Sequence, residues 1–381
     1  MNTNTTRTYR IGCVTSSVSY HGGWDTLSKG IISAVSRVHG VVVLTARGTE
    51  SDEVPYPVHA VLPSRYSSFG LLNQIRTAWQ CLRYFQNCDA IHTFIEPLTP
   101  GAAFASWLMR KPLLMTLAGT YCVVPSGGSL RSVVKRTLMV FMYRRASFIA
   151  TGSRQNIELI EREVSLAGKW EFVPFGVDLE KFTPRDGVSA PEHPFLLTVG
   201  SLKPRKGADY VIRALALIKD DVPDLHYYIV GSFDERNGFI CQLQQLATEN
   251  GLQERVHLLG RVSDEALRDM YQTCAVFVLA AQTVGGSFEG FPMVYYESQA
   301  LGAPVIGTSG YGSDYIIHDG ENGFLIPQEN VTRLADAIRR IATDGVLRER
   351  MSVRARQEAR RHSWSVIAKH YLVAYGRVTQ S

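Results

Sequence analysis

The feature that most constrains this chain is a repeated alternation of short apolar runs with amphipathic stretches. In the first half, the runs at residues 9–15, 40–46, 90–95 and 112–118 have the length and composition of buried strands. An amphipathic helix is expected at residues 70–86. Its apolar positions share one face: Leu71, Ile75, Ala78 or Trp79, Leu82 and Phe85. Strands that alternate with helices predict a parallel sheet covered on both faces.

The alternation stops at residues 182–194 and then restarts. That segment, FTPRDGVSAPEHP, is rich in proline and polar residues and lacks an apolar period, which is typical of an interdomain linker. The sequence therefore predicts an α/β protein with two doubly wound, Rossmann-like domains facing a central cleft. The predicted domains are residues 1–186 and residues 187–363. Ligands of such sheets bind in the loops at the carboxyl ends of the strands.

Composition and charge narrow the function classes. Of the 381 residues, 45% are hydrophobic and 20% charged, as in a soluble globular protein. The net charge of +5 favours anionic ligands but is too small to imply a nucleic acid partner. The six cysteines form no C-x-x-C motif, so reduced thiols are expected. Neither a signal core nor a run of about 20 apolar residues is present, and a cytoplasmic protein is expected.

The segment SFEGFPMVYYESQALGAPVIGT, residues 287–308, carries two carboxylates eight positions apart, Glu289 and Glu297. Pro292 suits the first turn of a helix that would run to about Gly302. Glu289 would then lie on the loop before this helix and Glu297 inside it, so that both could face one pocket.

The expected helix end has donors as well as acids. The N–H groups of Phe291, Met293 and Val294 would point out of it, and a helix N-terminus attracts phosphate. Carboxylates suit sugar hydroxyls because they accept hydrogen bonds. The alternative is that Glu289 only complements the helix dipole and that Glu297 is solvated.

The segment VGSLKPRKGADY, residues 199–210, follows a predicted strand and opens a helix. Arg205 and Lys206 would therefore lie at the carboxyl end of that strand, where two cations can neutralise a diphosphate leaving group. The alternative is a solvated basic turn.

Together these segments resemble the retaining nucleotide-sugar glycosyltransferases of family 4 (group 1), which have the GT-B fold. The resemblance is strongest over residues 195–327 and includes VGSLKPRKG, RVHLLGRVSDEAL, EGFPMVYYE, ALGAPVIGT and DGENGFLIP. It implies that Lys206 and Arg205 bind the donor diphosphate, and that Glu289 contacts the donor sugar and helps to stabilise the transition state. It also implies that Glu297 binds the ribose.

The resemblance implies further donor contacts and an acceptor site. The GRVSD turn would flank the base, and the HGGW loop would approach the donor phosphate or the acceptor. The remaining implied donor contacts are Gly22, Gly23, Ser201, Arg261, Val262, Gly290, Phe291, Pro292, Met293 and Val294. Thr120 and Tyr121 would lie near the acceptor in the first domain. Residues 364–381 resemble the terminal helix that crosses back to that domain.

Two positions depart from the family pattern. Ser201 stands where many members have Arg, and Arg205 is expected to replace that charge. Ala118 stands where many members have a His that positions the donor or acts in catalysis. His21 and His92 are the candidates to replace it, but we expect a front-face reaction in which the leaving phosphate takes the proton.

A basic stretch at residues 129–145 raises the question of membrane contact. On a helical wheel its five basic residues do not share a face, which favours a partly buried helix with basic ends. Peripheral contact with anionic lipid stays open, and with it a location at the inner face of the cell membrane.

The sequence thus predicts a metal-independent, retaining hexosyltransferase, since no D-x-D motif is present. It would need no cofactor beyond its UDP-sugar or GDP-sugar donor. The acceptor would be a carbohydrate, a lipid-linked molecule or a small molecule, in polysaccharide, glycolipid or other glycoconjugate synthesis. The alternatives are a GT-B nucleotide-sugar epimerase and a catalytically weak nucleotide-binding subunit.

Overall fold

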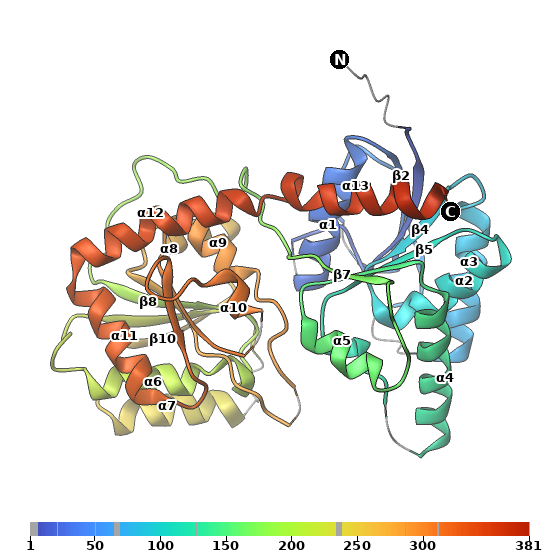
Figure 1. Cartoon of the computed structure of the whole chain (residues 1–381). Coiled ribbons are helices and arrows are strands. Elements are labelled where there is room, and N and C mark those ends of the chain that lie inside the picture. The colour runs from blue at the N-terminus through green and yellow to red at the C-terminus, as the bar shows by residue number, and fades with distance from the viewer. Residues whose placement is uncertain are drawn as a thin grey trace. The chain divides into compact units, whose positions relative to one another are not determined.

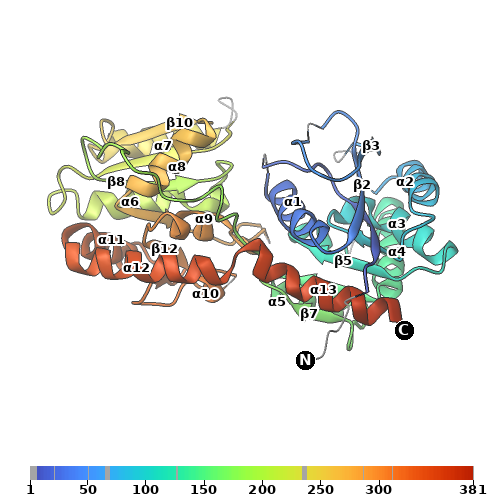
Figure 2. The same cartoon turned by 90° about the horizontal axis from the view of Figure 1, so that it is seen from above.

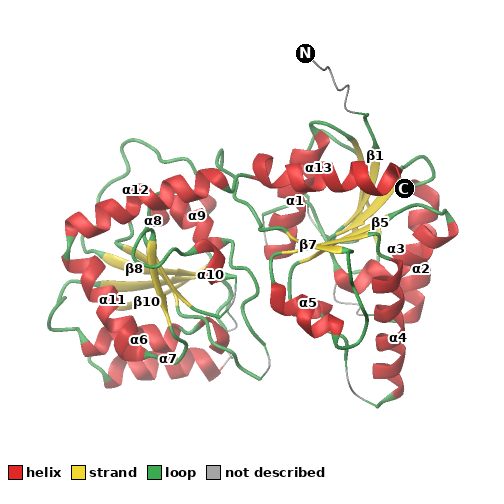
Figure 3. Cartoon of the chain, in the orientation of Figure 1, coloured by secondary structure: helices red, strands yellow, loops and turns green. Residues whose placement is uncertain are grey.

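The computed structural model describes residues 7–20, 22–49, 51–64, 69–125, 128–233, 238–285, 287–310 and 312–380. The chain divides into two compact units, each with its own sheet and helices (Figure 1). The N-terminal unit comprises Met1–Gly176 and Trp364–Ser381, and the C-terminal unit comprises Val177–Ser363. In each unit the strands form a sheet with helices packed on it (Figure 3).

The N-terminal unit has a seven-stranded parallel sheet in the order β3-β2-β1-β4-β5-β6-β7. Its apolar runs form the central strands, as predicted. The strands are β1 (Arg10–Val14), β2 (Gly40–Ala46), β3 (Val58–Leu62), β4 (Ala90–Thr93), β5 (Leu113–Leu117), β6 (Phe148–Thr151) and β7 (Trp170–Phe172).

Helices cover this sheet. They are α1 (Gly23–Ser36), α2 (Leu71–Tyr84), α3 (Thr99–Leu108), α4 (Leu130–Arg145), α5 (Arg154–Glu161) and α13 (Trp364–Gln380), with short turns η1 (Glu96–Leu98) and η2 (Thr120–Cys122). Helices α2 to α5 share one buried apolar cluster with the strands. Helices α2, α3 and α4 lie side by side (Figure 1, Figure 2).

The C-terminal helix α13 is part of the N-terminal unit and packs on α1. The two helices approach so closely that a Cβ atom on Gly30 would come within 2.1 Å of the Trp364 ring. Two buried tyrosines of α13, Tyr371 and Tyr375, also bond to groups of the sheet.

The C-terminal unit has a six-stranded parallel sheet in the order β10-β9-β8-β11-β12-β13. Its strands are β8 (Phe195–Val199), β9 (His226–Val230), β10 (Val256–Gly260), β11 (Val276–Leu279), β12 (Val305–Thr308) and β13 (Gly323–Ile326). Its helices are α6 (Ala208–Leu217), α7 (Gly238–Glu249), α8 (Asp264–Thr273), α9 (Val294–Ala300), α10 (Ser313–Ile316), α11 (Val331–Thr343) and α12 (Gly345–Arg361), with the turn η3 (Pro204–Lys206). The predicted α/β class with two Rossmann-like sheets is confirmed.

The division between the units falls after Gly176, whereas the sequence places the boundary after residue 186. Ion pairs explain the difference, because they hold the intervening residues on α8. Lys181 Nζ lies 2.6 Å from a carboxylate oxygen of Asp264, and Arg185 lies 2.7 Å from Glu265 and 2.5 Å from Asp269. The start of the predicted linker therefore packs on the C-terminal unit.

Helix α2 buries a different face from the one that its apolar residues suggest. Gln74, Thr77, Ala78 and Cys81 are buried, whereas Leu71, Ile75 and Trp79 are exposed. The reason is the close approach of α3, since a Cβ atom on Gly101 would come within 2.5 Å of the Gln74 carbonyl oxygen. Small and polar residues fit this narrow contact, and the larger apolar residues point outward.

Five of the six cysteines are buried and Cys241 is exposed; all six are free thiols. Within the described ranges, no helix combines the length and the apolar composition needed to cross a bilayer.

Candidate active site

The turn between β8 and α6 is shaped by a glycine. Gly207 has a φ of +68°, and a Cβ atom there would come within 1.8 Å of the Ala280 carbonyl oxygen. Two residues before Gly207, the carbonyl oxygen of Arg205 accepts a 2.9 Å hydrogen bond from the Gln282 N–H. The turn that carries Arg205 and Lys206 is therefore fixed against the residues that follow β11.

Three residues that the sequence names as catalytic come together at this turn. Lys206 Nζ lies 2.7 Å from Glu289 Oε2, and the Arg205 guanidinium donates to the same oxygen. The Glu289 side chain is 14% exposed and that of Lys206 11%, so this cluster is shielded but reachable. The two cations and one carboxylate leave one net positive charge.

Two opposing effects set the pKa of Glu289. Burial alone would raise it, but the charges of Lys206 and Arg205 and their hydrogen bonds hold the pKa below its usual value. Glu289 is therefore a carboxylate at neutral pH. It can accept hydrogen bonds or stabilise positive charge, and it is not suited to donate a proton.

Helix α9 is shorter than expected and is seven residues long. The Tyr295 N–H bonds to the Pro292 carbonyl oxygen at 3.1 Å, and the Gly302 N–H bonds to the Gln299 carbonyl oxygen at 3.0 Å, so each bond spans three residues instead of the four of an α-helix. The expected helix from Pro292 to Gly302 thus shrinks at both ends because these residues form turns rather than helix. This weakens the case for a phosphate site at the helix end and leaves Arg205 and Lys206 as the main groups for an anion.

Glu297 is half-buried and accepts a 3.0 Å hydrogen bond from the Tyr271 hydroxyl. Burial holds the pKa of Glu297 above its usual value, although the Tyr271 bond and the charge of Lys181 partly oppose this rise. The carboxylate is therefore held by a side chain of α8 rather than simply solvated.

Most of the other predicted donor contacts lie in the C-terminal unit. Exposed Arg261 and half-buried Val262 come directly after β10, and exposed Ser201 comes after β8. The Gly290 carbonyl oxygen accepts a 3.0 Å bond from the Gly312 N–H, which fixes the segment before α9. Within that segment, Phe291 and Pro292 are buried, and Met293 and Val294 are half-buried.

In the N-terminal unit, the Gly-Gly loop lies beside the predicted acceptor turn. Gly22 and Gly23 open α1, and the ring of the next residue, Trp24, lies 5.1 Å from that of Tyr121 in η2. A Cβ atom on Gly23 would meet nothing within 4 Å, and one on Gly22 would meet only Asp25, at 3.3 Å. The protein itself thus leaves open space at this loop. Thr120 begins η2, and His21 lies outside the described residues.

A buried carboxyl that no sequence motif predicts lies beneath the Ala118 position. Glu96 is 1% exposed, and its Oε1 accepts a 3.2 Å bond from the Ala118 N–H. Its Oε2 is buried and has no hydrogen-bond partner among the described residues. Burial raises the pKa of Glu96 to about 7. An acid inside the apolar run FIEPL was the available signal.

His92 has a structural environment. It is fully buried, with Nδ1 2.6 Å from the Tyr375 hydroxyl and Nε2 2.8 Å from Thr116 Oγ1. Burial lowers the pKa of His92 to about 3. Both ring nitrogens are engaged in joining α13 to the sheet, so His92 is not placed to take a proton from a substrate.

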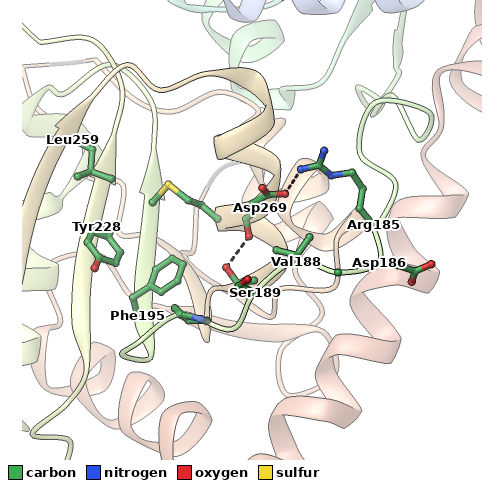
Figure 4. Close-up of a pocket in the computed structure, with 12 residues that line it drawn as sticks. Arg185, Asp186, Val188, Ser189, Phe195, Tyr228, Leu259 and Asp269 are labelled. Carbon is green, nitrogen blue, oxygen red and sulfur yellow. Dashed lines mark hydrogen bonds and ion pairs between the residues drawn. The ribbon is translucent and has the colours of Figure 1, made fainter.

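A cavity of about 670 Å³ lies elsewhere in the C-terminal unit (Figure 4). It is lined by the 185–191 segment, by α8 and by Phe195, which is the first residue of β8. The Arg185 side chain points toward Asp269 at its edge (Figure 4). The cavity thus lies toward the amino end of β8, whereas Lys206 follows the carboxyl end, and no predicted site residue lines it.

Comparison with known proteins finds a likeness over the C-terminal half of the chain. Residues 180–358 match the family model described as glycosyl transferases group 1. The matched residues lie within the C-terminal unit. The matched residues include Glu289, Glu297, Arg205 and Lys206.

Two relatives and one solved structure illustrate the likeness. The D-inositol 3-phosphate glycosyltransferase of Streptomyces avermitilis is 29% identical over 246 residues, 61% of this chain and 52% of that protein. The phosphatidyl-myo-inositol mannosyltransferase of Mycobacterium leprae is 32% identical over 179 residues, 47% of this chain and 45% of that protein. The chain thus spans about half the length of these curated relatives.

The solved structure covers both units. It is the HepE protein of Anabaena in complex with UDP and glucose, with a TM-score of 0.75 and 19% identity over 97% of this chain and 100% of that one. At this identity the likeness concerns the fold, which is GT-B.

Proposed function

We propose that the protein is a retaining glycosyltransferase that moves a hexose from a nucleoside diphosphate sugar to an acceptor hydroxyl. The observation that carries this proposal is the convergence of Lys206 and Arg205 on Glu289 within the segment that matches the group 1 family. The C-terminal unit would bind the donor and the N-terminal unit the acceptor.

The two cations would act on the diphosphate. As the bond between the sugar C1 and the phosphate oxygen breaks, negative charge grows on the leaving nucleoside diphosphate. Preorganised cations at that point stabilise the transition state. Lys206 and Arg205 would supply this charge, and the reaction would then need no metal ion or cofactor. The donor would compete with Glu289 for the same cations.

The acids would hold the two ends of the donor. Glu289 would accept hydrogen bonds from the sugar and favour the positive charge that develops near C1. Glu297 would bind the ribose, with Arg261 and Val262 beside the base. Backbone groups of residues 290–294, together with Ser201, would complete the donor contacts.

The acceptor would need no side-chain base. The acceptor oxygen forms a bond to C1 on the face from which the diphosphate departs, and its proton passes to the departing phosphate oxygen. Two observations support this route: the Ala118 side chain carries no titratable group, and His92 is buried with both nitrogens engaged. Gly22, Gly23, Thr120 and Tyr121 would position the acceptor.

The names of the relatives suggest which substrates to test first. Those proteins are named for inositol phosphate and phosphatidylinositol acceptors, and a further relative is named as GDP-mannose-dependent. UDP-hexoses and GDP-hexoses should therefore be offered with inositol phosphates, phosphatidylinositol and simple sugars. Such an enzyme would serve glycoconjugate synthesis in the cytoplasm.

The test is incubation with this panel of donors, with and without acceptors and with and without a chelator. The proposal expects a glycosylated product that forms only with an acceptor, retains the donor's anomeric configuration and survives the chelator. Donor isomerisation without an acceptor would identify an epimerase. Nucleotide binding without any turnover would identify a catalytically weak subunit.

A further inference from the structure

Helix α2 exposes a stripe of large apolar side chains to solvent. Leu72, Ile75 and Trp79 are 69%, 57% and 64% exposed, and their spacing of three and four residues places them on one side of the helix. Isolated exposed apolar residues are ordinary, whereas contiguous apolar surfaces mark interaction sites.

Helix α3 continues this apolar surface. Phe104, Trp107 and Leu108 are 45%, 55% and 49% exposed, and the first two rings lie 5.6 Å apart. The two helices are fixed side by side, because the Gln74 side chain accepts from the Gly101 N–H and donates to the Pro97 carbonyl oxygen, both at 2.8 Å. Both helices also bury their inner sides in one core, so their outer stripes face the same way.

Helix α4 extends the surface on the other side of α3. Its first turns expose Leu130, Val133 and Val134, while Met139 and Met142 further along are buried in the same core. We call the outer sides of these three helices the α2–α3–α4 face.

Positive charge predominates around this face, although Arg136 of α4 is paired with Glu163. Residues 71–145 contain nine Lys and Arg residues but only two acids, Asp89 and Glu96, and Glu96 is buried. Arg76 and Arg83 are exposed and lie three residues before and four residues after Trp79, on the same side of α2. Each arginine can keep its charge in water while its stem lies along an apolar surface.

We propose that the α2–α3–α4 face docks on the surface of an anionic lipid bilayer. Trp and Phe side chains favour the boundary between headgroups and acyl chains, and adjacent Arg side chains bind lipid phosphates. A second copy of the chain fits less well, since two such faces would bring like charges together. The basic residues of α4 alone do not form an interfacial helix, and the face arises only where three helices meet.

The experiment is co-sedimentation of the full chain with vesicles of phosphatidylcholine, with or without phosphatidylglycerol. The wild type should bind the anionic vesicles at least about tenfold more strongly than the neutral ones, and added salt should weaken this binding. The tryptophan emission should also shift to the blue as Trp79 and Trp107 leave water.

Two pairs of variants locate the surface. Arg76→Glu/Arg83→Glu should weaken binding by about tenfold or more, since each basic residue near an anionic surface contributes a factor of roughly five. Trp79→Ser/Trp107→Ser should abolish the blue shift. The matched controls are Arg350→Glu/Arg354→Glu and Val346→Ser/Val373→Ser, which change exposed residues of α12 and α13 and should bind like the wild type.

Three results would overturn the proposal: no preference of the wild type for anionic vesicles, equal losses in the face and control variants, or a dimer in solution that the face variants dissociate. The assay contains no nucleotide sugar, so its outcome is independent of the proposed transfer activity.

Discussion

The proposed chemistry depends on a few residues, and only some of their contacts could be predicted from the sequence. Glu289, Arg205 and Lys206, which the sequence picks out by motif, lie within bonding distance of one another. Glu96 escaped notice because the sequence gives no sign that β4 and β5 bring it beneath Ala118. The sequence did not predict the contacts of His92 either, because its partners Tyr375 and Thr116 are distant in the chain.

Replacement of Lys206 by Ala should weaken the binding of a nucleoside diphosphate far more than that of the nucleoside. A hydrogen bond to a charged group is worth about 1.5–3 kcal/mol, and the nucleoside lacks the phosphates that Lys206 would contact. Isothermal titration calorimetry with both ligands measures the difference. Equal losses for the two would place Lys206 outside the diphosphate site.

The buried Glu96 carboxyl should make the N-terminal unit less stable as the pH rises. Its folded pKa of about 7 lies above the ordinary value of 4.5, so its contribution is complete below pH 4.5 and is lost as the pH passes through 7. The loss should reach about 3 kcal/mol. Glu96→Gln should remove this slope in urea unfolding measured at several pH values, and an unchanged slope in the variant would show that Glu96 is not its source.

His92→Ala should lower stability without lowering the turnover of the folded enzyme. The change leaves the buried Tyr375 hydroxyl without its His92 partner, at roughly 1–3 kcal/mol, and removes one of the two bonds of the Thr116 hydroxyl. Thermal unfolding and turnover at saturating donor and acceptor are the measurements. A fall in turnover of about 10²–10⁴-fold in the folded variant, the usual contribution of a side-chain base, would overturn the leaving-group route.

At the scale of elements, the sequence predicts the strands better than the helix faces. Central strands such as β5 and β11 read as continuous apolar runs because both faces of a parallel sheet are buried. The edge strands β3 and β7 were missed, since both are mostly half-buried and β7 has only three residues. Helix α3 was missed as well, because its buried side is made of small residues and lacks an apolar period.

The turn between β8 and α6 allows a test of local geometry. Gly207→Ala should destabilise the C-terminal unit by roughly 3 kcal/mol or more, because the new Cβ atom would overlap the Ala280 carbonyl oxygen. Gly320→Ala is the control, since Gly320 has a similar φ of +78° and open space around it. Its cost should be only about 1–2 kcal/mol. Equal costs in chemical unfolding would mean that close approach does not shape the turn.

At the scale of the whole molecule, alternation along the sequence was enough to predict two Rossmann-like units. The exact division was not predicted, because the ion pairs of Lys181 and Arg185 with α8 join residues about eighty positions apart. The α2–α3–α4 face was also beyond the sequence, since it depends on which side of each helix meets the core. The helical period allowed either Ala78 or Trp79 on the apolar face of α2, and the structure buries Ala78 and exposes Trp79.

The central claim is that Glu289, which forms ion pairs with Lys206 and Arg205, acts in sugar transfer and is not required for folding. The most direct test is the turnover of Glu289→Ala with the donor and acceptor that the wild type uses, alongside Glu321→Ala as an exposed acid of the same unit. The account predicts a folded Glu289→Ala protein whose turnover falls at least ~100-fold, the scale of losing a preorganised electrostatic group, while Glu321→Ala stays at the wild-type level. A folded Glu289→Ala protein with near-normal turnover would contradict it.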